Sequence, residues 1–300
     1  MSRHGYRSRG TEQGWAVIIV LVCGALLVGG LVVGTSGSGL AFTSPPTDVD
    51  LTPGELAGRF VWYLSLVLLG GIAAGVTVIG AGGRLAMRLL AATAGDDAQG
   101  RITEADEVVG EITADGTIGF VVFNGVFGGV VLGVLWLVLR RFLPPGRVGG
   151  LAFGLGLLVV LGTTVDPLRS ENPDFDVVGP GWLAVVVFTA MALAFGLTMQ
   201  GMVHRLSRWL PLPSRDRRVL VHYLPVLLLA VVGFSVTAVA VVVFLVVLGV
   251  TRWRGSADLV RSPRFVLAGR VLLGTAVAIG LPNAVSNIAD IAGRTAGGSG

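Results

Sequence analysis

The chain has 300 residues, of which 53% are hydrophobic and 13% charged, and its mean hydropathy is +0.81. Soluble domains carry about 25% charged residues, so this composition excludes an ordinary soluble protein. Apolar runs of about 20 residues, the length that spans a bilayer, recur along the chain. We therefore predict an all-α integral membrane protein, a multi-pass helical bundle with about seven transmembrane segments. A broken or re-entrant helix is an alternative for one of these segments.

The charge is carried by an unusual set of residues, because all 22 basic residues are arginine. A guanidinium binds phosphate well, so recognition of lipid headgroups is one explanation. A GC-rich genome is the explanation that we favour, since glycine and alanine are abundant as well. The arginines lie in short loops rather than in a basic soluble domain interleaved with aromatic residues, so we expect no nucleic-acid partner.

The N-terminal region predicts a tail, a helix and a linker. Residues 1–14 form a basic tail, and the apolar run 15–34 predicts a first transmembrane helix. A cleaved signal peptide is the alternative. The run is long for a signal core and no clear small-x-small cleavage motif follows it, so we favour a retained helix. Residues 35–59, rich in Gly, Ser and Pro, predict a linker.

Residues 60–282 are expected to form the rest of the membrane bundle, followed by a C-terminal tail at 283–300. Apolar runs predict its helices at 60–80, 118–139, 148–165, 181–201, 219–250 and 265–282. Every tryptophan of the chain lies at or near an end of such a run. This placement is typical of the two membrane interfaces, where the ring and its N–H are both accommodated.

Arginine counts suggest two arrangements of these spans. Simple alternation with the N-terminus inside divides the arginines almost evenly between the two sides. Placing the acidic loops 35–58, 95–117 and 166–180 outside, with the arginine clusters inside, creates the asymmetry expected of membrane proteins. That second arrangement, which we favour, needs an even number of crossings within 60–95 and within 219–250, as a re-entrant element would supply.

The acidic stretch 95–117 is predicted to be a solvated cap. It resembles an EF-hand calcium loop when Gly100 occupies position 6. However, Gly95 then stands where Asp is required, and Asp106 stands where a bidentate Glu is expected. Its β-branched residues and intervening turn formers predict a small hairpin instead. We therefore expect no metal site in this stretch.

No combination of residues in the sequence predicts catalysis. The segment GTSG at 34–37 resembles the serine motif of rhomboid intramembrane proteases, but it lies at a helix exit and no later span carries a central histidine. The three histidines lack metal-ligand spacing. The single cysteine, Cys23, excludes a disulfide within the chain and a cysteine-based metal cluster. We predict a protein that is not an enzyme and that binds no metal or cofactor.

Polar groups at membrane depth are costly and are therefore candidates for a function such as lining a substrate path. These are Arg84, Arg88, Asn124 and Asp166. Each also has a structural explanation. The arginines could extend to the interface, Asn124 could form an interhelical hydrogen bond, and Asp166 precedes a proline and could begin a turn.

Glycines spaced four residues apart predict close helix packing, because small residues let two backbones approach. They are Gly125, Gly129 and Gly133 in the third span and Gly150 and Gly154 in the fourth. We expect these two spans to form a tight pair, with homodimerisation as the alternative.

Two functional hypotheses follow. The first is a non-catalytic subunit, scaffold or sensor of a membrane complex in the bacterial plasma membrane, with a membrane-protein partner or a second copy of the chain. The alternative is a transporter for a small solute or an ion, suggested by the sparse intramembrane polar residues and a faint repeat between 121–144 and 186–211.

Overall fold

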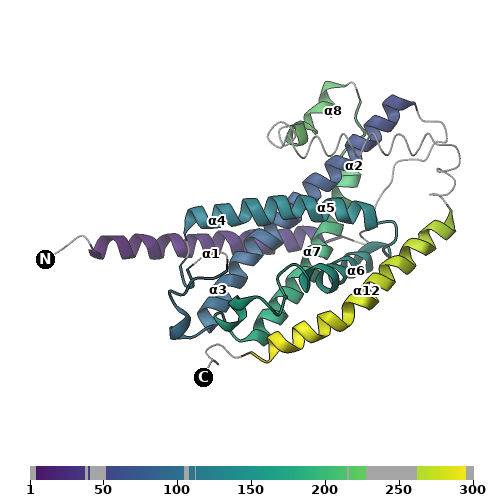
Figure 1. The fold of residues 1–300 in the computed structure, drawn as a ribbon. Coiled ribbons are helices and arrows are strands. Elements are labelled where there is room, and N and C mark those ends of the chain that lie inside the picture. Colours follow the sequence, from purple (N-terminus) through teal and green to yellow (C-terminus); the bar gives the residue numbers. More distant parts are fainter. Residues whose placement is uncertain are drawn as a thin grey trace.

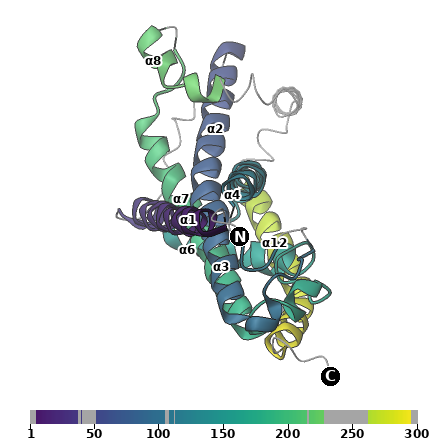
Figure 2. The ribbon, with the colours of Figure 1, turned by 90° about the vertical axis from the view of Figure 1, so that its left-hand side faces the viewer.

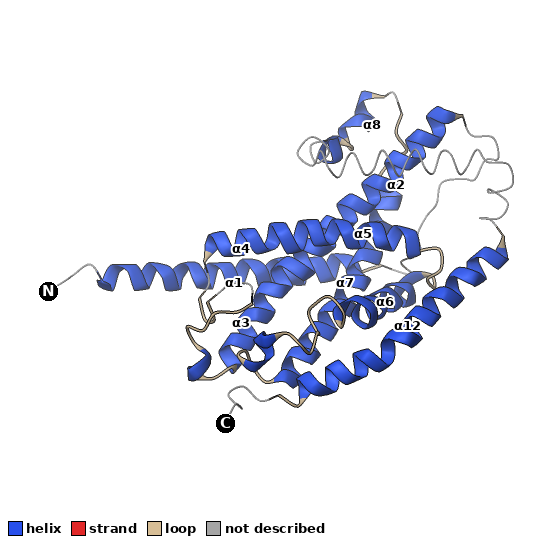
Figure 3. Cartoon of the chain, viewed as in Figure 1, coloured by secondary structure: helices blue, strands red, loops and turns tan. Residues whose placement is uncertain are grey.

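The computed structural model describes residues 5–37, 40, 52–104, 108–111, 113–214, 216–227 and 262–294. Over these residues the secondary structure is helical, without a strand (Figure 3). Five helices are long and apolar enough to cross a membrane, and a shorter apolar helix covers Gly146–Gly162. The all-helical prediction is confirmed for this part of the chain. Most of the predicted span 219–250 lies outside the described residues.

Before residue 128 the described part of the fold contains seven helical elements. They are α1 (Gly5–Thr35), α2 (Pro53–Ala74), the π-helical η1 (Gly75–Gly82), α3 (Gly83–Thr93), the 3-10 helix η2 (Asp96–Ala98), α4 (Ala114–Phe120) and the π-helical η3 (Val121–Phe127). The third long helix then continues as α5 (Gly128–Leu139).

The second half is arranged around one long helix. Its elements are α6 (Gly146–Leu157), the π-helical η4 (Leu158–Gly162), the 3-10 helix η5 (Pro173–Asp176), α7 (Gly181–Trp209), α8 (Arg217–Val221) and α12 (Pro263–Ala292). Figure 1 shows α12 along the outside of the bundle.

The stretch from Pro53 to Thr93 forms one continuous helix of 41 residues. At 1.5 Å per residue it is about 60 Å long, twice the thickness of a bilayer core. The prediction of a broken or re-entrant element within 60–95 is therefore wrong. The glycine-rich centre continues as π-helical turns, in which the backbone hydrogen bonds are kept.

Three predicted boundaries also move. The first helix begins at Gly5 rather than at residue 15, so most of the predicted N-terminal tail 1–14 is helical. The linker 35–59 ends earlier, because Thr52 and Glu55 form a capping box and Pro53 occupies the first turn, which together start a helix. The C-terminal tail 283–300 begins later, because α12 continues through Pro282 to Ala292. Asn287 anchors this extension by donating a hydrogen bond to the carbonyl of Thr163 at 2.9 Å.

The helices run between two ends of the bundle, which we call the acidic end and the basic end. At the acidic end α3 finishes, α7 begins and α12 finishes, and the Gly181 N–H donates to the Arg294 carbonyl at 3.1 Å. At the basic end α2 begins, α7 finishes and α12 begins. There the Phe142 and Phe265 rings lie 5.9 Å apart, and the Trp62 indole donates to the Leu210 carbonyl at 2.8 Å.

This arrangement contradicts the simple alternation of seven spans. Alternation requires α7 to finish and the last helix to begin at opposite ends of the bundle, with 219–250 crossing once between them. In the structure α7 finishes and α12 begins at the same end (Figure 1). The arrangement with an even number of crossings in both stretches is contradicted in turn by the continuous helix Pro53–Thr93.

The glycines of the third and fourth spans contact other helices rather than each other. Gly125 and Gly129 lie against Gly75 and Gly71 of the long second helix, and a Cβ on Gly133 would lie 2.8 Å from the Val67 carbonyl oxygen. The predicted pairing of the third span with the fourth is therefore wrong. Its glycine face is matched by the glycines of α2 and η1, which run antiparallel to it.

The fourth span packs against α7 instead. A Cβ on Gly150 would lie 2.9 Å from the Gly196 carbonyl oxygen, and one on Gly154 would lie 2.9 Å from the Leu193 Cα. Figure 2 views the bundle along α1 and α4, which are seen nearly end-on, while α2–α3 runs from the top of the view to its lower part. The fold thus contains two glycine-mediated crossings, α2–η1 on η3–α5 and α6 on α7.

A buried polar network connects the basic half of the bundle. The Trp136 indole donates to the Gln200 side-chain oxygen at 3.2 Å, and the Gln200 amide donates to the Leu40 carbonyl at 2.8 Å. All three residues are buried. Gln200 therefore joins α5, α7 and the segment that follows α1.

Two arginines hold the end of α1. Arg205 of α7 donates to the Val33 carbonyl at 2.7 Å and to the Ser36 carbonyl at 3.0 Å. Arg147 of α6 donates to the Thr35 carbonyl at 2.9 Å and to the Gly37 carbonyl at 3.1 Å. Cations at a helix C-terminus satisfy its free carbonyls and oppose the negative end of its dipole.

Candidate functional site

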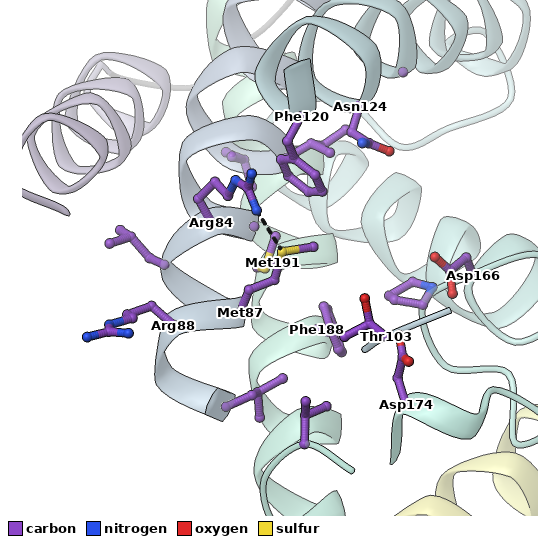
Figure 4. A pocket seen from close by; sticks show the side chains of 18 of the residues that line it. Arg84, Met87, Arg88, Thr103, Phe120, Asn124, Asp166, Asp174, Phe188 and Met191 are labelled. Atoms are coloured by element: carbon purple, nitrogen blue, oxygen red, sulfur yellow. Dashed lines mark hydrogen bonds between the residues drawn. The ribbon is translucent and has the colours of Figure 1, made fainter. Parts of the chain in front are cut away.

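A cavity of 680 Å³ lies toward the acidic end of the bundle. Its walls come from α1, η1–α3, η3–α5, η4 and α7, and its edge comes from the loops around 103–111 and 165–178. The four polar residues singled out in the sequence, Arg84, Arg88, Asn124 and Asp166, all line it, although they come from three separate regions of the chain (Figure 4).

Differences in side-chain size explain why the cavity forms here. At Gly75 and Gly125 the two backbones touch, so no space remains between the helices. Two turns closer to the acidic end, a Cβ on Gly83 would meet the Phe120 ring at 2.8 Å and the Met191 Cε at 3.8 Å. The large side chains of Phe120 and Met191 therefore hold the helices apart at this level. The space that remains between the helices is the cavity.

Arg84 projects into this space from the first turn of α3. Its guanidinium carbon lies 5.2 Å from the centre of the Phe120 ring, and Nη1 lies 3.8 Å from the Met87 sulfur. The Nε and Nη2 atoms are buried. Figure 4 shows Arg84 beside Phe120, Met87 and Met191. A ring face attracts a cation, so the contact with Phe120 stabilises the guanidinium.

Arg88 has a different role. It is exposed, and its Nη1 donates to the Gly110 carbonyl at 3.0 Å. In Figure 4 its guanidinium points away from Asp166. The neighbouring Gln99 donates to the Ala91 carbonyl at 2.9 Å. Arg88 and Gln99 thus attach the acidic cap to the end of α3.

The cap itself contains a tight antiparallel turn. Ile102 and Val108 form an isolated antiparallel bridge, and the Val109 N–H donates to the Arg101 carbonyl at 2.9 Å. The predicted hairpin is therefore confirmed at one residue pair, while strands do not form in the described part of the cap. Too few residues on either side of the turn continue the pairing.

Asp166 lies across the cavity from Arg84, in the loop after η4 (Figure 4). Solvent reaches one side of this residue, but protein atoms crowd its carboxylate, and this desolvation raises its pKa above the ordinary value. The charge of Arg169 and a hydrogen bond with Asn172 act in the opposite direction. The groups that act on Asp166 thus belong to its own loop and to the adjacent cap.

Arg169 joins the two acidic loops. It forms an ion pair with Glu104 at 3.0 Å, and the Glu104 N–H donates to an Asp174 carboxylate oxygen at 2.8 Å. On the other side of the loop, Arg294 pairs with Asp176 at 3.1 Å. The carboxylates at the edge of the cavity are therefore held by contacts within the acidic end.

Asn124 lies on η3 one helical turn after Phe120 and is exposed. Among the described residues it forms no interhelical hydrogen bond, which is the structural role that its sequence position suggested. It instead contributes an amide to the cavity lining.

The sequence did not identify Phe120, Phe188 and Met191, which surround Arg84 and separate it from Asp166 (Figure 4). Phe120 could have been found, because it precedes Asn124 by four residues and so shares its helix face. The two α7 residues carry no local signal, since their neighbours in the first half of α7 are almost all apolar and the facing helix is far away in the sequence.

Metal binding has no obvious place in the described part of the chain, where no three His, Cys, Asp or Glu side chains come together to hold an ion. Cys23, a free and buried thiol, lines the cavity from α1.

The cavity as a whole is an apolar chamber with polar groups at one end, which suits the binding of an amphipathic molecule.

No known protein family, curated protein or solved structure matches the chain. The geometry of this cavity is therefore the basis of the functional argument.

Proposed function

We propose that this chain is a non-catalytic multi-pass protein of the bacterial plasma membrane that binds a small molecule, as the sensor or binding subunit of a membrane complex. The observation that carries the proposal is the 680 Å³ cavity that Arg84, Arg88, Asn124 and Asp166 line. Sites for small molecules measure about 300–1,000 Å³ and combine apolar walls with a few polar groups. This cavity has both properties.

The backbone around the cavity supports the same proposal. Each of the three π-helical stretches contributes to its lining, with Ile79 from η1, Asn124 from η3 and Leu161 from η4. Short π-helical turns are often found at functional sites, because an extra residue in a turn changes the direction of the side chains that follow it. Three such turns meet at this one chamber.

The experiment fills the cavity. Gly128 lines it, and a Cβ there would meet only the Ile79 Cδ1 at 3.9 Å, so Gly128→Leu places a side chain in the space without a backbone clash. Gly119→Leu is the matched control on the same helix, because its Cβ would meet nothing within 4 Å and it does not line the cavity. The probes are photoactivatable single-chain amphiphiles, added to purified protein in nanodiscs.

We expect saturable labelling of wild-type protein, mapped by mass spectrometry to peptides that line the cavity. Gly128→Leu should abolish this labelling and Gly119→Leu should preserve it. Equal labelling of both variants, with both still folded by size-exclusion chromatography, would refute the proposed binding function.

A transporter is the second candidate, and α1 is the observation that favours it. This helix forms one wall of the cavity through Ile19, Val20 and Cys23, yet only 11% of its apolar window is buried. Most of this helix is exposed on its outer side, so a displacement of α1 would open the chamber. Flux of a bound probe across proteoliposomes would support transport, whereas binding without flux would support the sensor.

We further propose that the basic end faces the cytoplasm. The described arginines there outnumber the described acidic residues, which are Glu55 and Asp216, as the positive-inside rule requires. Those arginines are Arg59, Arg140, Arg141, Arg147, Arg205, Arg208, Arg217, Arg218, Arg264 and Arg270. Arg7 and Arg9 lie in the first turns of α1, away from the basic end, and lower this asymmetry.

Single cysteines test the orientation in a Cys23→Ser background. Asp96→Cys reports on the acidic end, and Ser214→Cys reports on the basic end. A membrane-impermeant maleimide added to intact spheroplasts should label only Asp96→Cys. Labelling of Ser214→Cys alone would reverse the orientation.

A further inference from the structure

We propose that the cavity binds the hydrocarbon chain of a membrane lipid, which enters sideways from the bilayer between the third long helix and the segment that follows η4. This inference rests on the proposed binding function and specifies the ligand and its route. The position of the cavity's opening, the depth of that opening in the membrane and the chemistry of the lining lead to it.

The opening of the cavity is marked by residues that line it and are also exposed. On the third long helix these are Phe123 and Val131, which are 70% and 65% exposed. Val165, after η4, also lines the cavity and is 64% exposed. The third helix packs through η3 against η1, whereas η4 packs against α12. Different partners thus hold the two sides of the opening, which we call the rim and define by Phe123, Val131 and Val165.

The part of the rim on the third long helix lies at membrane depth. This helix, Ala114–Leu139, has 26 residues and is about 39 Å long at 1.5 Å per residue. Phe123 and Val131 are therefore roughly 14 and 26 Å from its start. A bilayer core is about 30 Å thick, so a helix of this length that crosses it holds both side chains in hydrocarbon. This side of the rim faces lipid chains rather than water.

The deeper lining of the chamber is aliphatic. Its branched side chains come from four elements and are Val78 and Ile79 of η1, Leu132 of α5, Leu157 of α6, and Leu158 and Leu161 of η4. Apolar cavities hold water poorly, and the atoms that line an empty cavity lose van der Waals contacts. A hydrocarbon chain would restore these contacts, and the bilayer supplies such a chain at the rim.

The charges around the chamber indicate which part of the lipid enters it. The three rim side chains are uncharged, and next to Phe123 the lining continues with the uncharged amide of Asn124. Arg84 is engaged within the chain, by Phe120 among others. A charged group is costly at membrane depth. The chain of the lipid therefore passes the rim, while the polar head stays outside at the acidic end, where Asp166 lines the edge of the cavity.

The test uses lipids with a photoactivatable diazirine at the end of the chain, in nanodiscs that contain the purified protein. One probe is a diacyl phospholipid and the other is a single-chain fatty alcohol. We expect labelling of peptides that line the chamber to exceed labelling of α12, whose Leu272 is 71% exposed and serves as the measure of ordinary lipid contact. Labelling by the phospholipid would identify a chain of the bilayer itself as the occupant, and labelling by the alcohol alone would identify a free single-chain lipid. Both results support a hydrocarbon chain.

Val131→Trp tests the route, because an indole at the rim occupies the path of the chain. We expect about ten-fold less labelling of the chamber by both probes, with labelling of α12 unchanged. Val138→Trp is the matched control, since Val138 lies two turns further along the same helix, is 61% exposed and does not line the cavity. It should behave like wild type, and both variants should elute as folded protein in size-exclusion chromatography.

A second measurement varies the length of the alcohol's chain. Lipid chains are as apolar as leucine, so transfer from the bilayer into the chamber brings no hydrophobic gain. Affinity then depends on how well the chain fits the chamber, and labelling of the chamber relative to α12 should pass through a maximum as the chain lengthens. A ratio that stays constant with chain length would indicate surface lipid only and would overturn the inference.

Two further results would overturn the inference and leave the binding function intact. The first is equal labelling of the chamber in wild type and in Val131→Trp, with labelling lost in Gly128→Leu, which would place the entry elsewhere. The second is no labelling of the chamber above that of α12 by either lipid, together with saturable labelling by a water-soluble amphiphile that Gly128→Leu abolishes. If Gly128→Leu leaves labelling of the chamber by every probe unchanged, the proposed function itself fails.

Discussion

The two halves of the continuous helix Pro53–Thr93 have opposite surroundings. In the half toward the basic end, Gly71 and Gly75 let the backbone of the third span come into direct contact. In the other half, Arg84 faces a chamber kept open by Phe120 and by residues of α7. One helix thus serves as a rigid packing surface along part of its length and as the wall of a cavity along the rest.

This difference shows how a membrane bundle can be both tightly packed and hollow. Lipid chains are as apolar as leucine, so helices associate in membranes through close van der Waals contact rather than through hydrophobic burial. Close contact in one half holds the helices in place. The other half can then tolerate empty space and a charged side chain.

The largest effect is expected at the glycine crossing. A Cβ on Gly75 would run into the Gly125 carbonyl and would lie 2.7 Å from the Gly129 Cα, so Gly75→Leu must push the two helices apart. We expect a loss of about 3 kcal/mol or more and little folded protein after detergent extraction. Fluorescence-detected size-exclusion chromatography measures this loss. Gly156→Leu, whose Cβ would meet nothing within 4 Å, should stay folded.

The next effect is expected at Gln200. Gln200→Leu removes the acceptor of the Trp136 indole N–H and the donor to the Leu40 carbonyl, both buried, which should cost about 2 kcal/mol. The measurement is the midpoint of thermal unfolding in mild detergent. In a double-mutant cycle with Trp136→Phe, the combined loss should be smaller than the sum of the two single losses. A strictly additive result would show that the contact contributes nothing.

A smaller effect is expected where α1 ends. Arg205→Met removes the donor that holds the Val33 and Ser36 carbonyls, with an expected cost of about 1 kcal/mol. The readout is the rate of proteolysis in the segment after α1, which should rise. Arg208→Met, an exposed change in the last turn of the same helix, is the control. An equal rate for both variants would argue against the cap.

The smallest effect is a pH dependence at Asp166. Desolvation raises its pKa above the ordinary value of 3.8, so the folded protein favours the neutral carboxyl. The contribution of Asp166 to the free energy of unfolding is therefore fully present below pH 3.8, its ordinary pKa. This contribution is lost as the pH rises through the higher pKa of the folded state. Solvent on one side of the residue keeps the effect small.

Asp166→Asn should remove this part of the pH dependence and gain stability over wild type as the pH rises. Thermal unfolding across an acidic to neutral pH series measures the difference. Glu171→Gln, an exposed change on the same loop, should follow wild type. A difference between Asp166→Asn and wild type that is constant with pH would contradict the assignment.

The helical ends were less predictable than the helical class. The expected start at residue 60 missed the capping box at Thr52 and Glu55, a signal that the sequence does contain. The expected stop at 282 followed the end of the apolar run, yet the helix continues through Pro282 to Ala292, and a tertiary contact at Asn287 anchors this extension. The start of a helix at a capping box can therefore be predicted from the sequence. The end of a helix that depends on contacts with distant residues cannot.

By itself the sequence determined that this is an all-helical chain with long apolar helices, where its scarce polar side chains lie, and which helices carry glycine faces. Only the tertiary structure decided that the glycines of the third span meet α2–η1 and that Arg84 and Asp166 line one chamber. The physical reason is that periodicity records which face of a helix can be approached closely. It does not record the partner, because helices far apart in sequence present chemically equivalent faces and the whole bundle selects among them.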